Sequence, residues 1–174
     1  MLSPAFIGEI VNRVAPKYGL RPDIVLCIIL QESQGNPFAN RFEKHIYNRL
    51  VPLKREELSG WKPDADYNDK ELEPSLETEK VNRAISWGLM QVLGETGRWC
   101  ARVSVPFLSA LQEPELGADT GCKVLSYYLK THGTYDKALA AYNAGTPTST
   151  QGQQYARKVL FRLSAGEHKA YLQG

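Results

Sequence analysis

The chain has 174 residues, 43% of them hydrophobic and 23% charged, which is the balance of an ordinary soluble globular protein and excludes disordered and collagen-like classes. This length fits a single domain over residues 1–174, with a core that needs no metal or disulfide to fold. The net charge of +2 would suit an anionic polymer. The Lys and Arg residues are scattered, however, which argues against a nucleic-acid-binding protein.

The N-terminal residues show no recognisable export signal, because residues 1–14 lack a basic region followed by an apolar run. The longest strongly apolar stretch is Ile24–Leu30, and a membrane span needs ~20 such residues. We therefore expect a soluble protein without a transmembrane helix.

Cysteine and histidine usage predicts neither a disulfide framework nor a metal site. The three cysteines lie far apart without a CxxC pair, and the three histidines form no metal-ligand spacing. These residues are Cys27, Cys100, Cys122, His45, His132 and His168. We expect the thiols to be small buried side chains, with one disulfide pair left open as an alternative. No cofactor is expected.

The first predicted helix begins at Ser3-Pro4, a pair typical of a helix start. Apolar residues then recur at three- and four-residue spacing as far as Val14, which predicts an amphipathic helix that ends near Tyr18-Gly19.

Pro22 opens a second helix whose segment Ile24–Leu30 is apolar on every side, as expected of a core helix. A run this short could instead be a buried strand. Gln31-Glu32-Ser33 extends it to helical length, and Gly35-Asn36-Pro37 then ends it. We therefore predict a buried helix.

The rest of the chain divides into a polar middle, residues 41–80, and a helical remainder. The acidic cluster within the middle is typical of a solvated loop, and a helix is predicted from Pro74 towards Ala84. Further helices are predicted at Gly94–Val103, Glu113–Lys130, Tyr135–Ala144 and Gly152–Ser164. Since no alternating strand pattern is evident, we expect a mainly α fold, with a small β-hairpin in the polar middle left open.

Glu32 is the most unusual residue of the sequence. It follows an apolar run and Gln31 at the C-terminal end of a helix that should lie inside the protein. Burial and the negative end of the helix dipole both disfavour the ionised carboxylate and raise its pKa. A glutamate that is protonated near neutral pH can supply the proton that a glycosidic oxygen needs as its bond breaks. The alternative is a helix-end glutamate that points into solvent.

Three segments of the chain resemble motifs of bacterial and phage lytic transglycosylases, and they occur in the family's order. Residues 32–37 resemble its "ESxxNP" motif, residues 86–91 its "SxGLMQ" motif and residues 140–145 its "AAYNAG" motif. The resemblance implies a lysozyme-like domain in which Glu32 is catalytic. The candidate substrate-binding residues are Ser33, Ser86, Gly88, Met90, Gln91, Tyr142 and Asn143.

These residues also have a physical interpretation of their own. Gly88 permits a tight turn and a close approach to a ligand, Met90 can fill an irregular gap in the core, and Gln91 offers a donor and an acceptor to sugar groups. Tyr142 and Asn143 precede a glycine that predicts a helix end, which would leave their polar groups at the rim of a cleft. The alternative for Tyr142 is a core aromatic.

The sequence departs from the family pattern in the long separation of the first two motifs. Residues 34–87 lie between "ES" and "GLMQ", where the typical enzyme has a short link. Within this segment, residues 41–45 resemble an "RFE" segment of phage-type relatives and an "FExH" segment of some phage muramidases. The segment supplies a second candidate carboxylate, Glu43, for which the alternative is an exposed glutamate in a salt bridge.

The resemblance implies cleavage of peptidoglycan glycan strands by one glutamate, with 1,6-anhydro-muramyl ends as product and without a cofactor. One rival is a hydrolytic muramidase of the same fold, in which Glu43, Asp64 or Asp66 activates water. The other is a wall-binding virion protein without turnover. We expect a monomer that reaches the cell wall through a holin-type pore or on a phage virion.

Overall fold

The computed structural model of the chain describes residues 2–58 and 75–172. The fold is mainly helical, as predicted, with one small antiparallel sheet. The α-helices are α1 (Pro4–Val14), α2 (Pro22–Glu32), α3 (Lys44–Leu50), α4 (Leu76–Arg83), α5 (Gly94–Trp99), α6 (Pro114–His132), α7 (Tyr135–Ala144), α8 (Thr150–Ala165) and α9 (Lys169–Leu172). The strands are β1 (Asn40–Phe42), β2 (Ile85–Trp87) and β3 (Val92–Leu93), and short 3-10 helices lie at Ala15–Tyr18, Arg55–Glu57 and Leu108–Gln112.

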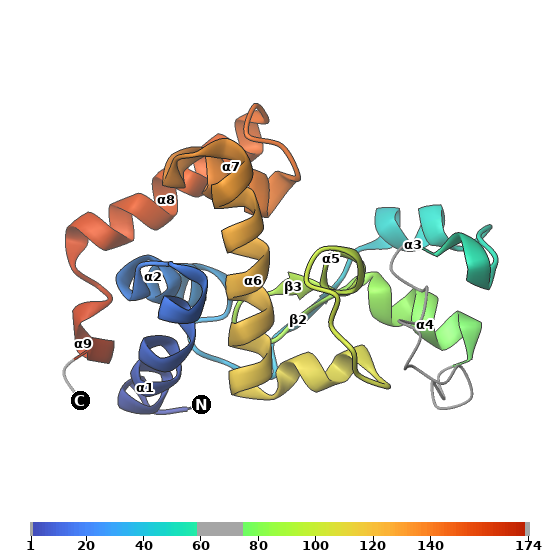
Figure 1. Ribbon diagram of the computed structural model, residues 1–174, viewed down its shortest axis with the longest axis horizontal. Helices are drawn as coiled ribbons and strands as arrows, with labels where there is room; N and C mark the ends of the chain where they lie inside the picture. The colour runs from blue at the N-terminus through green and yellow to red at the C-terminus, as the bar shows by residue number, and fades with distance from the viewer. Residues whose placement is uncertain (1, 59–74, 173–174) are drawn as a thin grey trace.

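The α2 helix forms the centre of the main hydrophobic core. Each side chain from Ile24 to Ile29 is at most 1% exposed, which confirms the core helix predicted from its uniformly apolar sequence. The core also takes in buried residues of α1, α6, α7 and α8. Figure 1 shows these helices gathered on one side of the molecule, with the sheet, α3 and α4 extending to the other side.

The sheet places the start of the polar middle segment, at Arg41, next to the "SxGLMQ" motif. β2 and β3 form a hairpin across residues 88–91, and β1 pairs with β2 so that Arg41 lies opposite Ser86. Gly88 has φ +70°, and a Cβ there would stand 2.2 Å from the Leu111 carbonyl oxygen. The tight turn expected at Gly88 is therefore present, and the close approach is made to the protein's own backbone.

Several predicted boundaries differ from those of the structure. The helix expected at Gly94–Val103 ends at Trp99, because the following chain folds back to bring two carbonyl groups to the Arg98 guanidinium. Ser75 caps α4 by accepting from the Thr78 backbone NH, at 3.2 Å. The expected start of that helix at Pro74 lies outside the described residues, as do Asp64 and Asp66. The helices α3 and α9 were not predicted.

All three cysteines are free thiols, so the alternative of a disulfide pair is not realised. Cys27 and Cys122 are buried, and burial raises the pKa of their thiols to about 11 and about 12.

Within residues 2–58 and 75–172, no helix is long and apolar enough to cross a membrane. The same part of the chain holds no group of three or more His, Cys, Asp or Glu residues suited to a metal ion.

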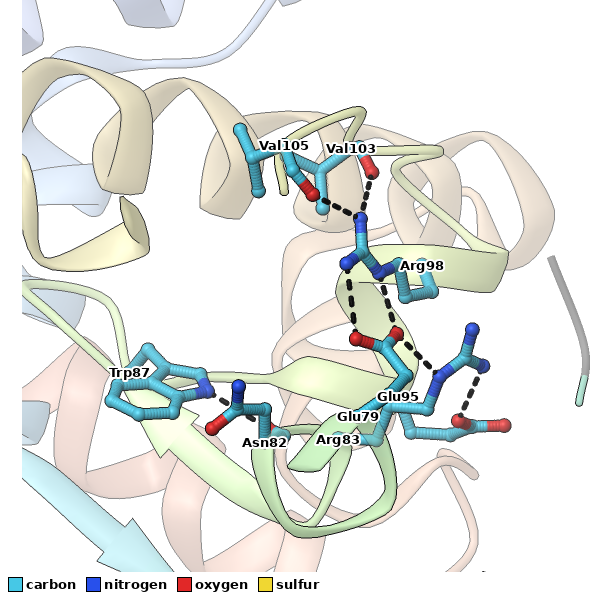
Figure 2. A network of polar contacts seen from close by, with 8 residues as sticks. All are labelled: Glu79, Asn82, Arg83, Trp87, Glu95, Arg98, Val103 and Val105. Atoms are coloured by element: carbon cyan, nitrogen blue, oxygen red, sulfur yellow. Dashed lines mark hydrogen bonds and ion pairs between the residues drawn. The ribbon is translucent and has the colours of Figure 1, made fainter. Parts of the chain in front are cut away.

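A buried network of charged side chains joins α4 to α5 (Figure 2). Glu79 and Arg83 are both 0% exposed. The Glu79 carboxylate accepts from Arg83 Nε at 2.8 Å and from Arg98 Nε and Nη2 at 2.8 and 3.1 Å, while Arg83 Nη1 donates to Glu95 at 3.0 Å. Arg98 Nη1 also donates to the carbonyls of Val103 and Val105. One carboxylate thus holds two guanidinium groups and the loop after α5.

We predict that Glu79→Gln lowers the free energy of unfolding by about 3–5 kcal/mol, because it leaves two buried guanidinium groups without their shared carboxylate. Urea unfolding at neutral pH measures the loss. Glu115→Gln is the matched control, since its partner Arg13 and Glu115 itself are about half exposed, and an exposed pair contributes about 0–1 kcal/mol. Equal losses in the two variants would contradict the prediction.

Candidate active site

Glu32 is the last residue of α2, and the chain turns sharply directly after it. Gln34 and Gly35 both have positive φ, 52° and 79°, which ends the helix at the position that the sequence predicts. The hydroxyl of Ser33 donates to the Leu89 carbonyl at 2.8 Å. This bond ties the end of α2 to the β2–β3 turn, so the first two motifs are in direct contact.

The Glu32 side chain lines a cleft of about 530 Å³. The walls of the cleft come from the end of α2, the segment from β1 to α3, the β2–β3 hairpin, α5, α6 and the region from α7 to the start of α8. The predicted site residues in its lining are Glu32, Glu43, Ser86, Gln91, Tyr142 and Asn143. All three motifs therefore contribute to one cleft.

A larger cavity, of about 670 Å³, lies between the end of α6, the start of α7 and the side of α8. The one carboxylate in its lining is Asp136, which is exposed and whose pKa is lowered by its interaction with Thr134. A carboxylate of lowered pKa is a poor proton donor at neutral pH. The cleft at Glu32 is accordingly the better candidate for acid–base chemistry.

The pKa of Glu32 is raised above its ordinary value, chiefly because burial disfavours the ionised form. The Tyr155 hydroxyl and the charge of Arg41 act in the opposite direction and lower the pKa, but the effect of burial prevails. The carboxyl is only partly enclosed, since it also faces the cleft. Glu32 therefore combines a raised pKa with access to a bound molecule.

Tyr155 is a residue of this site that the sequence analysis missed. It lies on α8, is 7% exposed, and its buried hydroxyl has no hydrogen-bond partner in the described part of the chain. The hydroxyl is nevertheless close enough to Glu32 to lower the pKa of the carboxyl. A tyrosine on the apolar face of a helix is one available signal, because a buried phenol usually needs a polar partner.

Tyr142 is both a core aromatic and a residue of the cleft lining, the two roles that the sequence analysis considered. Its ring packs against the main core, and its hydroxyl donates to the Met90 carbonyl at 2.8 Å. It also lines the cleft, at the end of a helix that Gly145 terminates with φ 74°. The third motif is thereby attached to the same hairpin turn that Ser33 contacts.

The remaining candidate residues differ in whether their side chains line the cleft. Gln91 donates its amide to the carbonyls of Ala39 and Gly88, at 2.8 and 3.0 Å. Asn143 has a buried side-chain oxygen without a hydrogen-bond partner in the described structure. Ser33, Gly88 and Met90 do not line the cleft, and Met90 is completely buried. Their contacts position the cleft wall, and contact with a ligand stays a prediction for them.

Glu43 lines the cleft, as a second candidate carboxylate should. It also forms a salt bridge, which was the alternative role considered for it. Arg41 Nε donates to its carboxylate at 2.6 Å, and His45 Nδ1 stands 3.9 Å from the other oxygen. Its side chain is 20% exposed, against 71% for Arg41. Glu43 is therefore near the candidate chemistry, with one carboxylate oxygen occupied by a guanidinium group.

We predict that Glu32→Gln raises the free energy of unfolding at neutral pH. The pKa of Glu32 is higher in the folded chain than its ordinary 4.5, so ionisation destabilises the folded state as the pH rises from the ordinary pKa to the raised one. The gain over wild type should shrink at about pH 4, where the carboxyl is mostly protonated in both states. Urea unfolding at the two pH values tests this, with exposed Glu9→Gln as the control. A less stable Glu32→Gln at neutral pH would refute it.

Comparison with known proteins bears directly on this cleft. The family model of the transglycosylase SLT domain matches residues 9–163, a range that includes all three motifs and the whole described cleft lining. No curated protein and no solved structure gives a match to the chain. The family match supports peptidoglycan lytic transglycosylase activity in general, with peptidoglycan as the substrate. The chain belongs to the family of transglycosylase SLT domains.

Proposed function

We propose that the protein cleaves the β-1,4 bond between N-acetylmuramic acid and N-acetylglucosamine in peptidoglycan, with Glu32 as the only acid/base and 1,6-anhydro-muramyl ends as the product. The observation that supports this most directly is the position of Glu32, a carboxyl with a raised pKa at the inner wall of a cleft. A carboxyl in that state can act first as an acid and then as a base.

In the first step, Glu32 donates its proton to the glycosidic oxygen as the bond from that oxygen to C1 of the muramyl residue breaks. The carbonyl oxygen of the 2-acetamido group bonds to C1 and takes up the positive charge. In the second step, the C6 hydroxyl oxygen displaces the acetamido oxygen at C1 and gives its proton to the Glu32 carboxylate. The proton is restored, no water is consumed, and the ring product is an anhydro sugar.

Two features of the cleft support binding of an acetamido sugar. The side-chain oxygen of Asn143 lacks a partner in the described structure, and a buried acceptor of this kind gains a hydrogen bond from a ligand NH or OH group. The exposed guanidinium of Arg41 lines the same cleft, where it can meet the lactyl carboxylate or a peptide carboxylate of the wall. These contacts are proposed roles for both residues.

A hydrolytic muramidase is the second candidate, because Glu43 lines the same cleft as Glu32. In that mechanism the Glu43 carboxylate would remove a proton from water, and the carboxyl separation would fall in the range of about 5–9.5 Å known for paired-carboxylate glycosidases. The ion pair with Arg41 occupies one of the two carboxylate oxygens of Glu43. We therefore assign Glu43 the role of holding Arg41.

Mass spectrometry of digested glycan strands tests both parts of the proposal. Wild type should give anhydro ends, and Glu32→Gln should lose about 10²–10⁴-fold of its activity, the contribution of a positioned acid/base. Glu43→Gln is the matched variant and should still give anhydro ends, at a reduced rate. Hydrated muramyl ends from wild type would mean that the enzyme hydrolyses the bond, and would refute the transglycosylase mechanism. Near-normal turnover by a folded Glu32→Gln protein would remove Glu32 from the chemistry.

We predict that Tyr155→Phe shifts the alkaline limb of the pH–activity profile to higher pH. The Tyr155 hydroxyl lowers the pKa of Glu32, so its removal should raise that pKa further and keep the acid protonated to higher pH. Tyr128→Phe is the control, since Tyr128 also lines the cleft but is not among the groups that shift the Glu32 pKa. An unchanged limb, or one displaced to lower pH, would mean that Tyr155 does not tune the acid.

A further inference from the structure

A row of aromatic rings leads from the cleft to the surface of the molecule. Tyr128 lines the cleft and is 8% exposed. Its ring meets that of Tyr127 edge-on, with centroids 5.3 Å apart, and Tyr127 meets Trp99 at 5.6 Å and 90°. Each ring is thus held by its neighbour in a favourable edge-to-face arrangement.

The outer two rings are accessible to a ligand. Trp99 is 38% exposed and Tyr127 is 44% exposed, although both are large apolar side chains. They come from different helices, α5 and α6, which lie against one another in Figure 1. Neighbouring exposed aromatics of this kind often mark an interaction surface, whereas scattered single ones do not.

This aromatic pair continues the wall of the cleft along the same two helices. Thr96 lines the cleft one helical turn before Trp99, and Val124 lines it one turn before Tyr127. Residues three apart lie on the same face of a helix. The pair therefore lies at the edge of the cleft, where a chain bound inside it would emerge.

A glycan strand must extend beyond a cleft of this size. The volume of about 530 Å³ suits a ligand of drug-like dimensions, so further sugars of a polymer have to lie on the adjoining surface. A pyranose ring presents C–H groups on its faces and hydroxyl groups around its edge. Aromatic side chains with a phenol or an indole NH offer the complementary arrangement, an apolar face with a polar tip.

We propose that Trp99 and Tyr127 form an outer sugar subsite, which binds one ring of a glycan strand whose reacting bond lies at Glu32. This inference rests on the proposed function for the identity of the strand. The rings are held in place before binding, so little conformational entropy is lost when a sugar packs against them.

Binding of chitin oligomers to the Glu32→Gln protein tests the subsite without turnover. Titration calorimetry compares chitobiose, which is short enough to stay within the cleft, with chitohexaose, which extends beyond it. Trp99→Ala and Tyr127→Ala should each weaken chitohexaose binding by about two- to tenfold. Both should leave chitobiose binding unchanged. Trp99→Phe should recover part of the loss, because it keeps an aromatic face.

Phe161→Ala is the matched control. Phe161 is 69% exposed on α8, and it makes none of the ring contacts found among the described aromatics. It should bind both oligomers like the parent protein. Thermal unfolding of every variant checks that the fold is retained.

The outcomes separate the subsite from the proposed function. Loss of chitohexaose affinity in a protein whose wild type does not cleave peptidoglycan would leave the subsite standing and refute the activity. Cleavage by wild type, with chitohexaose binding unaffected by Trp99→Ala and Tyr127→Ala, would overturn the subsite alone. Equal losses for both oligomers, or no binding of chitohexaose by the parent, would overturn it as well.

Discussion

Burial of α2 on all of its sides is the constraint on which the rest of the site depends. A helix surrounded by core residues cannot rotate or slide without exposing apolar surface, so its last residue has a fixed position. That residue is Glu32, and the interior that holds the helix also raises the pKa of the carboxyl. The same packing thus supplies both the location and the protonation state of the candidate acid.

The β2–β3 turn is the part of the cleft wall to which the motifs are attached. Ser33 donates to the Leu89 carbonyl from one side, and Tyr142 donates to the Met90 carbonyl from another. Both bonds end on main-chain oxygens of adjacent residues. Gly121 permits the close packing of α6 on this turn, because a Cβ there would lie 2.5 Å from the Met90 sulfur. Residues that do not face the cleft can therefore still determine its shape.

Sequence reasoning succeeded where one physical signal dominated. The all-apolar run after Pro22 predicted the core helix, and the positive-φ residues after Glu32 end it as expected. It failed where distant partners decide the outcome. The end of α5 at Trp99 depends on carbonyl groups that reach Arg98 from the following loop. The influence of Tyr155 on Glu32 depends on the packing of α8 against α2. The local sequence does not show which tyrosine this packing brings to Glu32.

The charged network between α4 and α5 has a consequence for how the two sides of the molecule respond to heat. The cost of taking charged groups out of water falls as temperature rises, whereas hydrophobic stabilisation per unit area levels off. The helical side is held mainly by apolar packing, whereas α4 and α5 are linked by the ion pairs Glu79–Arg98 and Arg83–Glu95. On warming, the attachment of α5 should weaken less than the packing around α2. The wall that carries Thr96 and Trp99 is thus built from the more heat-tolerant kind of contact.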